Sequence, residues 1–307
     1  MELRFDDRVA IVTGAGSSPG LGRSYAKYLA QRGARVLIND FALEIGDDGL
    51  TCAQRVVKEI NEDGGLALAD HHSCAEPESA KAIVDAVLDA WGRVDILINN
   101  AGVIIPAPFE DITDDDIVRT VNVHLMGHIW MCRAVWGPMA KQGYGRILNT
   151  SSNVMLGLAS QVVYGAAKGG VFSLTRGLSI EGAPVGILVN SLCPSAGTAG
   201  ARKLAEDDDS WMQDVFIPNF SPDLVAPTAA FLVHDSCSLT AQWIASSGGK
   251  VASGFFSKTV GIDDRDIDIE GVRERLGEIL DHDANFVVPE PIDYNRSSSF
   301  KPRAYKK

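Results

Sequence analysis

The short stretch "YGAAK" places a tyrosine and a lysine, Tyr164 and Lys168, four residues apart. Residues at positions i and i+4 of a helix lie on one face, so this spacing brings the phenol and the ammonium group together. A neighbouring ammonium group stabilises a phenolate and lowers the tyrosine pKa from its ordinary value of about 10. Tyr164 is therefore a candidate general base that accepts a proton near neutral pH.

A glycine-rich stretch, "TGAGSSPGLGR", follows the apolar run at residues 8–14. Glycines between a strand and a helix allow positive φ angles and the close approach of a pyrophosphate, which the helix N-terminus attracts. The spacing of the glycines is longer than in the usual dinucleotide loop. The surplus serines either bulge away or donate hydroxyl hydrogen bonds to the phosphates. The predicted cofactor contacts in this loop are Gly14, Gly16, Ser17, Ser18, Gly20 and Leu21.

An acidic residue, Asp40, ends the second apolar run, downstream of the last loop glycine, Gly22. Its position is close to the spacing of about 20 residues at which a carboxylate accepts hydrogen bonds from the adenosine ribose of a dinucleotide. Because a carboxylate repels a 2′-phosphate, Asp40 favours NAD over NADP.

Apolar runs that alternate with amphipathic stretches are the strand candidates of this chain. They lie at residues 8–14, 34–40, 66–70, 93–100, 145–152, 186–194 and 241–249. Near-continuous Val, Ile and Leu content is typical of parallel strands covered on both faces. Helical patterns lie between them, for example at residues 21–33 and 78–92, and Thr113 with Asp116 resembles a capping box. The sequence thus predicts an α/β fold, a single Rossmann-like, doubly wound parallel sheet of about seven strands with helices on both faces.

The length of 307 residues suits one large domain, which we expect at residues 1–256. Residues 198–222 resemble a mobile loop or a short helical flap. Residues 257–307 are expected to form a helical and extended C-terminal appendage, packed on the same domain or on a neighbouring subunit. Within it, the charged stretch at 263–280 predicts a helix and residues 281–307 an extended tail.

Composition argues against several classes of partner. The formal net charge of −12 disfavours nucleic acid and anionic membranes. No apolar run approaches the roughly 18 residues of a membrane span, and the N-terminus has no signal-peptide pattern, so we expect a cytoplasmic protein. The five scattered cysteines include no C-x-x-C pair, which argues against disulfides and zinc. His71, His72 and Cys74 lack a second ligand cluster, so no metal is expected.

The motifs together resemble the short-chain dehydrogenase/reductase family. They are "TGAG…GLG", "NNAG" (99–102), "SS" at a strand end, "YGAAK" and "NSLCPSAG" (190–197), in the family's order. Segments such as "INDFA", "VHLMG" and "HDSC" are similar to the (3R)-hydroxyacyl-CoA dehydrogenase domains of peroxisomal multifunctional β-oxidation enzymes. The resemblance implies an NAD-dependent dehydrogenase of a secondary alcohol. The expected substrate is a bulky 3-hydroxyacyl-CoA or a sterol-derived thioester.

The family's catalytic set is a Tyr, a Lys, a Ser and usually an Asn, and Tyr164 and Lys168 match the first two. The family's usual gap before the tyrosine gives Ser151, whereas the end of the strand gives Ser152. Counting forward from Asn99 by the family's usual intervals gives His124 in the Asn position and then Ser152. We therefore predict Ser152 and His124, and a histidine there can hold a water or relay protons itself.

The resemblance also implies further contacts with NAD. Tyr164 and Lys168 are expected at the nicotinamide ribose. For the adenine, a residue after the third strand is expected, and the register leaves Asp70, His72, Ser73 and Cys74 open, of which Ser73 and Cys74 are our prediction. The remaining predicted contacts are Asn100, Ala101 and Gly102 on the adenosine side and Pro194, Gly197 and Thr198 over the nicotinamide.

Two other functions are compatible with the same motifs. One is a hydroxysteroid or other ring-alcohol dehydrogenase that acts on the free alcohol. The other is a non-catalytic NAD(H)-sensing member, against which the intact Ser, Tyr and Lys set argues, because a sensor needs no base. The family also implies a homodimer or homotetramer, and the small-residue stretch "GAAKGG" suits close helix packing.

Overall fold

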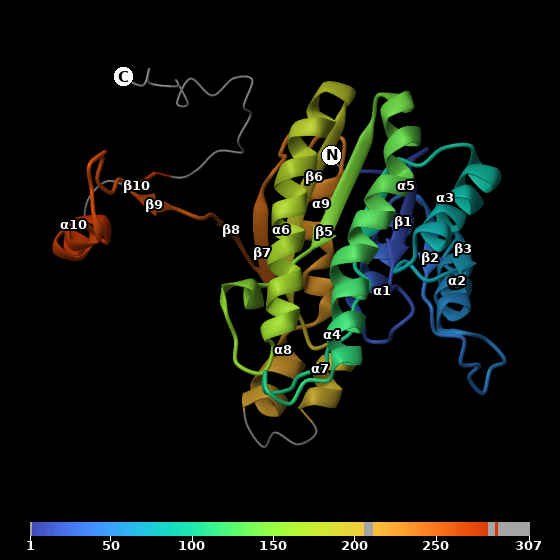
Figure 1. The fold of residues 1–307 in the computed structure, drawn as a ribbon. Coiled ribbons are helices and arrows are strands. Elements are labelled where there is room, and N and C mark those ends of the chain that lie inside the picture. The colour runs from blue at the N-terminus through green and yellow to red at the C-terminus, as the bar shows by residue number, and fades with distance from the viewer. Residues whose placement is uncertain (1, 206–210, 282–285, 288–307) are drawn as a thin grey trace. The chain divides into compact units, whose positions relative to one another are not determined.

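Eight strands form one sheet, in the order β3-β2-β1-β4-β5-β6-β7-β8 (Figure 1). The computed structural model describes residues 2–205, 211–281 and 286–287. All neighbouring strands from β3 to β7 are parallel, which confirms the predicted doubly wound sheet. The strands are β1 (Val9–Thr13), β2 (Arg35–Asn39), β3 (Leu66–Asp70), β4 (Ile96–Asn99), β5 (Gly145–Thr150), β6 (Ile187–Ser195), β7 (Trp243–Ser247) and β8 (Lys250–Gly254).

The sheet has one strand more than the seven apolar runs at which strands were expected. The apolar run at 241–249 contains only β7 and the turn residues Gly248 and Gly249, which both have positive φ angles. Strand β8 follows this turn, and it was missed because "KVASG" has a single strong strand former, Val251.

Helices cover both faces of the sheet, because each parallel connection crosses back over one face. The apolar cluster on one face joins α1, α2 and α9 to the strands, and the cluster on the other face joins α3, α5 and α6 to them. The helices up to Val233 are α1 (Leu21–Gln31), α2 (Cys52–Glu62), α3 (Pro77–Trp91), α4 (Asp114–Val121), α5 (Gly127–Gln142), α6 (Val162–Gly182), α7 (Ala199–Leu204), α8 (Ile217–Asn219) and α9 (Ala226–Val233).

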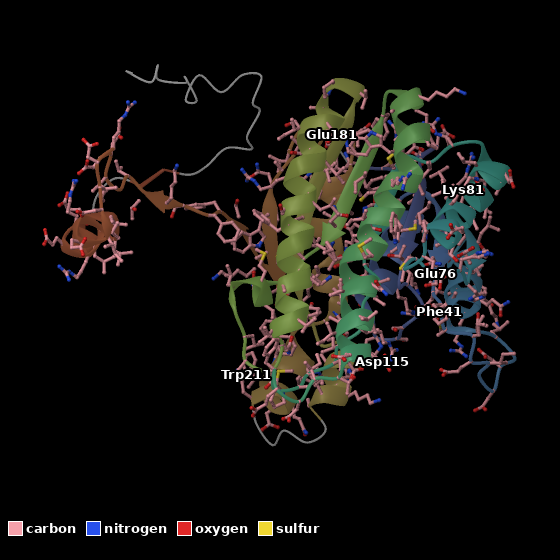
Figure 2. All side chains as sticks on the ribbon, in the orientation of Figure 1. Phe41, Glu76, Lys81, Asp115, Glu181 and Trp211 are labelled. Atoms are coloured by element: carbon pink, nitrogen blue, oxygen red, sulfur yellow. The ribbon has the colours of Figure 1, made fainter. Side chains whose placement is uncertain are left out.

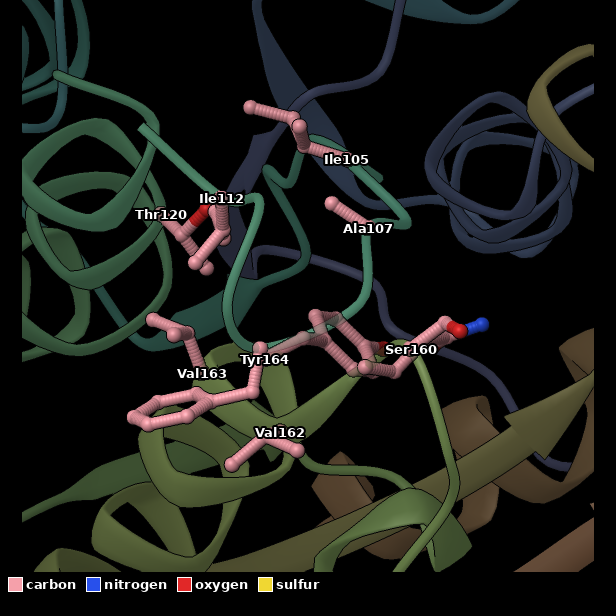
Figure 3. Close-up of a pocket in the computed structure, with 10 residues that line it drawn as sticks. Ile105, Ala107, Ile112, Thr120, Ser160, Val162, Val163 and Tyr164 are labelled. Atoms are coloured by element: carbon pink, nitrogen blue, oxygen red, sulfur yellow. The ribbon is translucent and has the colours of Figure 1, made fainter. Parts of the chain in front are cut away.

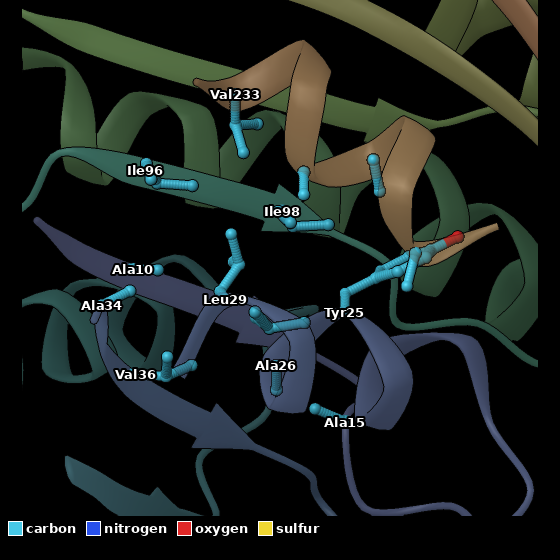
Figure 4. Close-up of a cluster of buried hydrophobic side chains, with 14 of the residues drawn as sticks. Ala10, Ala15, Tyr25, Ala26, Leu29, Ala34, Val36, Ile96, Ile98 and Val233 are labelled. Atoms are coloured by element: carbon cyan, nitrogen blue, oxygen red, sulfur yellow. The ribbon is translucent and has the colours of Figure 1, made fainter. Parts of the chain in front are cut away.

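Alternate residues of each central strand enter opposite cores, since successive side chains of a strand point to opposite faces. In β1, Ala10 and Val12 pack with α1 and α9 (Figure 4), whereas Val9 and Ile11 belong to the cluster with α3 and α5. Both clusters are fully buried at these positions. Because β1, β4, β5 and β6 are parallel, their carboxyl ends lie at one edge of the sheet, near the motif residues.

A π-helical turn interrupts the helix that precedes β5. Thr113 caps α4 through its hydroxyl group, which accepts from Asp116 N at 3.1 Å. This is half of the predicted capping box, because the Asp116 carboxylate accepts from the Thr113 hydroxyl group and not from its backbone N–H. The chain then passes through Asn122–Met126 in π-helical conformation and continues directly into α5. Such π turns are frequent at functional sites, and this one carries His124.

The contacts within the chain divide it into two units, Met1–Ser253 and Gly254–Lys307. In the second unit, β9 (Lys258–Thr259) pairs antiparallel with β10 (Phe286–Val287). The helix predicted at 263–280 is present as two short helices, α10 (Ile269–Glu274) and α11 (Leu276–Ile279). Most of the predicted tail at 281–307 lies outside the described residues.

The segment at 198–222 is helical where the structure describes it. It comprises α7, a π-helical turn at Met212–Phe216 and α8, and the exposed Trp211 stands near α8 (Figure 2). The acidic stretch at 206–210 lies outside the described residues. Across the described part of the chain, no helix has the length and apolarity that crossing a bilayer requires.

Candidate active site

The loop after β1 is held by the "NNAG" motif that follows β4. Gly14 has a φ of +62°, and a Cβ atom there would lie 2.6 Å from Ala101 Cα, so only glycine fits. The Asn100 amide group donates to the carbonyls of Thr13 and Gly14, at 3.0 Å each. The Thr13 hydroxyl accepts from Asn100 N at 3.0 Å and from Ala101 N at 3.1 Å. The side chain of Asn100 therefore shapes the loop.

The start of α1 is open to an anion. Gly20 occupies the N-cap position in extended conformation, no side chain caps the helix, and its first turn carries no acidic residue. The first N–H groups of a helix lack partners within the helix, and its positive end attracts phosphate. With the close-packed glycines beside it, this end of α1 fits the pyrophosphate of a dinucleotide. Ser17 and Ser18 are exposed on the same loop.

The loop residue after Ser18 is joined to α7. The Pro19 carbonyl accepts a hydrogen bond from Ala199 N, the first residue of α7, at 2.8 Å. The segment that contains the surplus serines is thus tied to the chain that follows β6, while Ser17 and Ser18 themselves are exposed.

The carboxylate of Asp40 meets the glycine loop at the end of β2. It accepts from Gly16 N at 2.8 Å through Oδ2 and from Ala42 N at 3.1 Å through Oδ1. A Cβ atom on Gly16 would come within 2.9 Å of this carboxylate and 2.4 Å of Cys52 Sγ. The half-buried Asp40 therefore stands beside the glycines at the place predicted for it.

The four candidates for the adenine contact lie at and after the end of β3, and they differ in burial and in hydrogen bonding. Asp70 is buried, and its carboxylate accepts from the Asn39 amide group at 2.8 Å and binds His72 Nδ1 at 2.8 Å. Its hydrogen-bonding capacity is thus used within the protein. Ser73 and Cys74 come next in the chain and are half-buried, and burial raises the pKa of the Cys74 thiol to about 11. In the described ranges, no three His, Cys, Asp or Glu side chains are grouped as metal ligands would be.

Tyr164 and Lys168 lie one turn apart on α6. The Lys168 ammonium group is fully buried, donates to the Thr150 carbonyl at 2.6 Å, and lies 5.7 Å from the centre of the Tyr164 ring. Burial lowers the pKa of Lys168 from 10.5 to about 7. Burial also raises the pKa of Tyr164, and the hydrogen bond with Ser152 offsets this only in part. The lowering of the tyrosine pKa that the spacing predicts is therefore outweighed here, because a buried phenolate loses its hydration.

The two neighbouring serines have different partners. Ser151 is buried, and its hydroxyl donates to the Lys168 carbonyl at 2.8 Å. Ser152 is half-buried, its hydroxyl accepts from Val154 N at 3.2 Å, and it hydrogen-bonds with the Tyr164 side chain. Ser151 thus fixes α6 to the end of β5, whereas Ser152 faces the phenol.

His124 packs against the edge of the tyrosine ring. The two rings are T-shaped, with centroids 4.8 Å apart, and the imidazole is almost fully buried. Its Nε2 atom bonds with the backbone of Val103, and a Cβ atom on Gly102 would come within 2.5 Å of its Cε1 atom. Burial and the Lys168 charge lower the pKa of His124 from 6.5 to about 3, so the imidazole is neutral at physiological pH.

The chain after β6 turns tightly before α7. Pro194 lies within β6, and Gly197 N donates to the Phe220 carbonyl at 2.7 Å. A Cβ atom on Gly197 would lie 2.9 Å from the Ile217 carbonyl oxygen, which accounts for the glycine. Thr198 caps α7 by accepting from Ala201 N at 3.2 Å.

A largely apolar pocket has Tyr164 in its wall (Figure 3). It lies between the segment after β4 and the start of α6. Its lining residues are Ile105, Ala107, Phe109, Ile112, Thr120, Ser160, Gln161, Val162, Val163 and Tyr164. Further exposed apolar side chains follow β4, β5 and β6, namely Ile104, Leu156, Leu158, Leu204, Trp211 and Val215.

Three features of the site escaped the sequence analysis. The Thr13 hydroxyl accepts hydrogen bonds from two backbone N–H groups. In the sequence, this role was indicated only by the position of Thr13 as the first residue of "TGAG". The Pro19 to Ala199 hydrogen bond joins segments that are far apart in the sequence, which no local pattern reports. His128 lies buried one turn after His124, and the four-residue spacing of the two histidines was the available signal.

Comparison with known proteins gives consistent matches. The family model "short chain dehydrogenase" matches residues 8–209. The chain is 36% identical over 298 residues to peroxisomal multifunctional enzyme type 2 of Mus musculus, covering 94% of this chain and 39% of that protein. It thus spans about two fifths of the length of the curated relatives that it matches first.

Two solved structures share the fold. Full-length peroxisomal multifunctional enzyme type 2 from Drosophila melanogaster is 33% identical, with a TM-score of 0.73 over 91% of this chain and 46% of that one. A short chain dehydrogenase from Mycobacterium avium is 30% identical, with a TM-score of 0.77 over 94% of this chain and 97% of that one.

Proposed function

This chain belongs to the short-chain dehydrogenase/reductase family, and we propose that it oxidises the secondary alcohol of a bulky 3-hydroxyacyl-CoA or sterol-derived thioester with NAD. Because its relatives are named dehydrogenases, the chain is an oxidoreductase that acts on CH–OH groups. Its family uses a nicotinamide nucleotide, and the choice of NAD and the substrate class are our proposals. The observation that carries them is the apolar pocket whose wall contains Tyr164, with Ser152 and Lys168 beside it.

The residues present fit a dinucleotide. The open N-terminus of α1 and the glycines Gly14, Gly16 and Gly20 would hold the pyrophosphate. Asp40 would accept from the adenosine ribose, and its charge favours NAD over NADP. The adenine would lie by Ser73 and Cys74, and the nicotinamide ribose by Lys168 and Tyr164.

The proposed reaction moves one proton and one hydride. Ser152 and Tyr164 hydrogen-bond the substrate hydroxyl, and the Tyr164 phenolate takes its proton. NAD, when bound, supplies the ring that accepts the hydride from the carbinol carbon, and its positive charge favours the phenolate. Lys168 keeps its ammonium group next to the phenol and thereby stabilises the ionised form during transfer.

The apolar lining of the pocket supports the proposed substrate class. An apolar wall stabilises a long acyl chain or a ring system in proportion to the area that it buries. The thioester carbonyl adjacent to the carbinol carbon would lie at the polar end, near Ser152. Homodimer or homotetramer formation is part of the proposal. The cytoplasmic localisation stays a prediction, and the names of several relatives carry the word peroxisomal.

A screen of NAD reduction tests the proposed function. The substrates are 3-hydroxyacyl-CoA esters of short and long chain, in both configurations, set against the matching free 3-hydroxy acids, hydroxysteroids and ring alcohols. We expect turnover with the thioesters and a KM that falls as the chain lengthens. Turnover confined to the free alcohols would replace this proposal with the ring-alcohol function. Binding of NADH without turnover of any alcohol would favour the sensing function.

A further inference from the structure

A threonine hydroxyl group without a partner lies in the wall of the apolar pocket. Thr120 is the penultimate residue of α4, its side chain is almost fully buried, and it lines the pocket together with Tyr164. Its hydroxyl oxygen has no hydrogen-bond partner within the part of the chain that the structure describes. Buried hydroxyl groups are nearly always paired, because an unpaired one loses its hydration without compensation. The Thr120 hydroxyl group is therefore available to a molecule in the pocket.

A second buried threonine shows how a helix ordinarily satisfies this side chain. Thr175 lies on α6, and its hydroxyl group donates to the Val171 carbonyl, one turn earlier, at 2.9 Å. The same oxygen accepts from the Asn149 amide group at 3.1 Å. Among the described residues, Thr120 makes neither kind of contact, although a threonine in a helix can bond with the carbonyl one turn before it. The unpaired state of Thr120 therefore does not follow from its place in a helix.

The wall across the pocket from Thr120 is held by the backbone. In Figure 3, Thr120 and Ile112 lie on one side of the pocket, and Ala107 and Ser160 lie on the other. The Ser160 carbonyl accepts from Ala107 N at 2.9 Å, which joins the segment after β4 to the segment before α6. Ser160 has a φ of +59°, a left-handed conformation that costs energy for residues other than glycine and is often found at ligand sites. A ligand thus meets a wall that is already in place.

The pocket lining decides which group the Thr120 hydroxyl can bind. The lining residues include no Lys, Arg, His, Asp or Glu in the part of the chain that is described, so an ionised group would be buried there without a counter-ion. A hydroxyl group both donates and accepts, so it suits a neutral oxygen, either of an alcohol or of a ketone. The Tyr164 phenol binds the reacting alcohol in the proposed function. The partner of Thr120 is then a second oxygen on the same substrate.

We propose that Thr120 is a specificity-determining residue. It selects substrates that carry a second neutral oxygen, a hydroxyl or keto group, on the acyl chain or ring a few carbons beyond the carbinol carbon. A plain hydrocarbon leaves the Thr120 hydroxyl unpaired, and a site that hydrogen-bonds a substrate oxygen discriminates strongly against the analogue that lacks it. The inference rests on the proposed function, because that reaction places the carbinol carbon at Tyr164.

An oxygen scan of the substrate tests the proposal in the full chain. 3-Hydroxyoctanoyl-CoA is compared with analogues that carry a second hydroxyl or a keto group at successive carbons beyond the carbinol carbon. Cyclohexanol is compared with the cyclohexanediols, so that a ratio is obtained in whichever series turns over. We expect one oxygenated position to raise kcat/KM roughly tenfold over the plain substrate, as for one hydrogen bond to a buried group otherwise left unpaired. Thr120→Val should remove this preference, and Thr120→Ser, which keeps the hydroxyl group, should retain it.

Thr175→Val is the matched control for the loss of a buried threonine hydroxyl. It should lower the Tm, because the Asn149 amide group loses its acceptor, and it should leave the substrate preference unchanged. Thr120→Val should leave the Tm unchanged or raise it, since an apolar group of the same shape replaces an unpaired hydroxyl. A fall in Tm as large as that of Thr175→Val would show that the Thr120 hydroxyl has a structural partner, and it would overturn the proposal. A Thr120→Val protein with the preference of the unmodified protein would overturn it too.

Binding without turnover separates this inference from the proposed function. Plain and oxygenated alcohols are added to the protein together with NADH, with which an alcohol cannot react, and the rise in Tm is compared. The oxygenated alcohol should stabilise the unmodified protein more than the plain one, and the two should stabilise Thr120→Val equally. This result supports the inference even where no alcohol turns over. Equal stabilisation of the unmodified protein by both alcohols overturns it, even where the substrate screen bears out the dehydrogenase.

Discussion

Lys168 and its neighbours show how burial decides the chemistry of single residues. The ammonium group donates one hydrogen bond to the Thr150 carbonyl. Burial lowers its pKa to about 7. The side chain therefore lies close to the point where a small change in its surroundings transfers a proton. The Tyr164 phenol shares this environment, and its ionisation in turnover depends on the charges that substrate and cofactor bring.

The two serines are predicted to differ sharply when each is replaced. Ser152→Ala should lower kcat by roughly 100-fold or more, because a hydrogen bond to the reacting oxygen is lost. Ser151→Ala should leave kcat within a few-fold and destabilise the fold by about 1–3 kcal/mol, since the buried Lys168 carbonyl loses its donor. Steady-state kinetics and urea unfolding measure both effects. The opposite ranking of the two kcat values would assign the catalytic role to Ser151.

Asp40 is predicted to set the cofactor preference. Asp40→Ala should weaken NAD binding about 10- to 100-fold, as expected for loss of a charge-assisted hydrogen bond, and should narrow the preference for NAD over NADP. Thermal shifts with each cofactor and fluorescence titration measure the change. Asp48→Ala is the control, because Asp48 pairs with Arg55 at 2.7 Å in the loop before α2. Better binding of NADP than NAD by the unmodified protein would contradict the role of Asp40.

The buried histidines predict a loss of stability in acid. The pKa of His124 is about 3 in the fold and 6.5 as the ordinary value, and that of His128 is also lowered. As pH falls below about 6.5, the unfolded chain binds protons that the folded chain does not, so the free energy of unfolding decreases. The slope should reach about 1.4 kcal/mol per pH unit for each histidine. Chemical unfolding between pH 7 and pH 4 measures it, and a His128→Phe slope equal to that of the unmodified protein would contradict the prediction.

At the scale of elements, the N-terminus of α1 and the π turn between α4 and α5 shape the candidate site. The alternation of apolar runs and helical patterns sufficed to predict the parallel sheet and the position of Asp40 after the second strand. The four-residue spacing predicted Tyr164 and Lys168 on one face of a helix, which is α6. The π turn at Asn122–Met126 could not be predicted, because it depends on how α4 and α5 pack and not on local preference. The choice of Ser152 over Ser151 rested on the end of the strand and on counting from Asn99.

The basic end of α7 predicts how a CoA ester would lie. Arg202 and Lys203 are exposed in its last turn and form no ion pair within the described part of the chain, whereas the first turn of α4 carries three aspartates. Arg202→Ser with Lys203→Ser should raise the KM of an acyl-CoA roughly threefold to tenfold. The KM of the matching N-acetylcysteamine thioester, which lacks phosphates, should not change.

Arg133→Ser is the control for this pair, because Arg133 is an exposed cation on α5. An equal rise in KM for both thioesters would show that α7 contacts the acyl part and not the phosphates.

At the scale of the whole molecule, an exposed stripe of small residues on α6 bears on assembly. Ala166, Ser173 and Gly177 lie on one side of this helix and are exposed. Light scattering coupled to size-exclusion chromatography should give two or four times the mass of one chain. Ser173→Arg should lower that mass by opposing close helix packing, whereas Gln31→Arg on α1 should not. A single-chain mass for the unmodified protein would contradict the prediction.

The tie between Pro19 and Ala199 constrains how this sequence can evolve. The first N–H group of α7 depends on a carbonyl that lies in the glycine loop, next to the surplus serines. Shortening that loop to the usual length would shift the carbonyl and leave the start of α7 without its acceptor. A chimera that takes one of the two segments from a relative should therefore regain stability only when the other segment is exchanged with it.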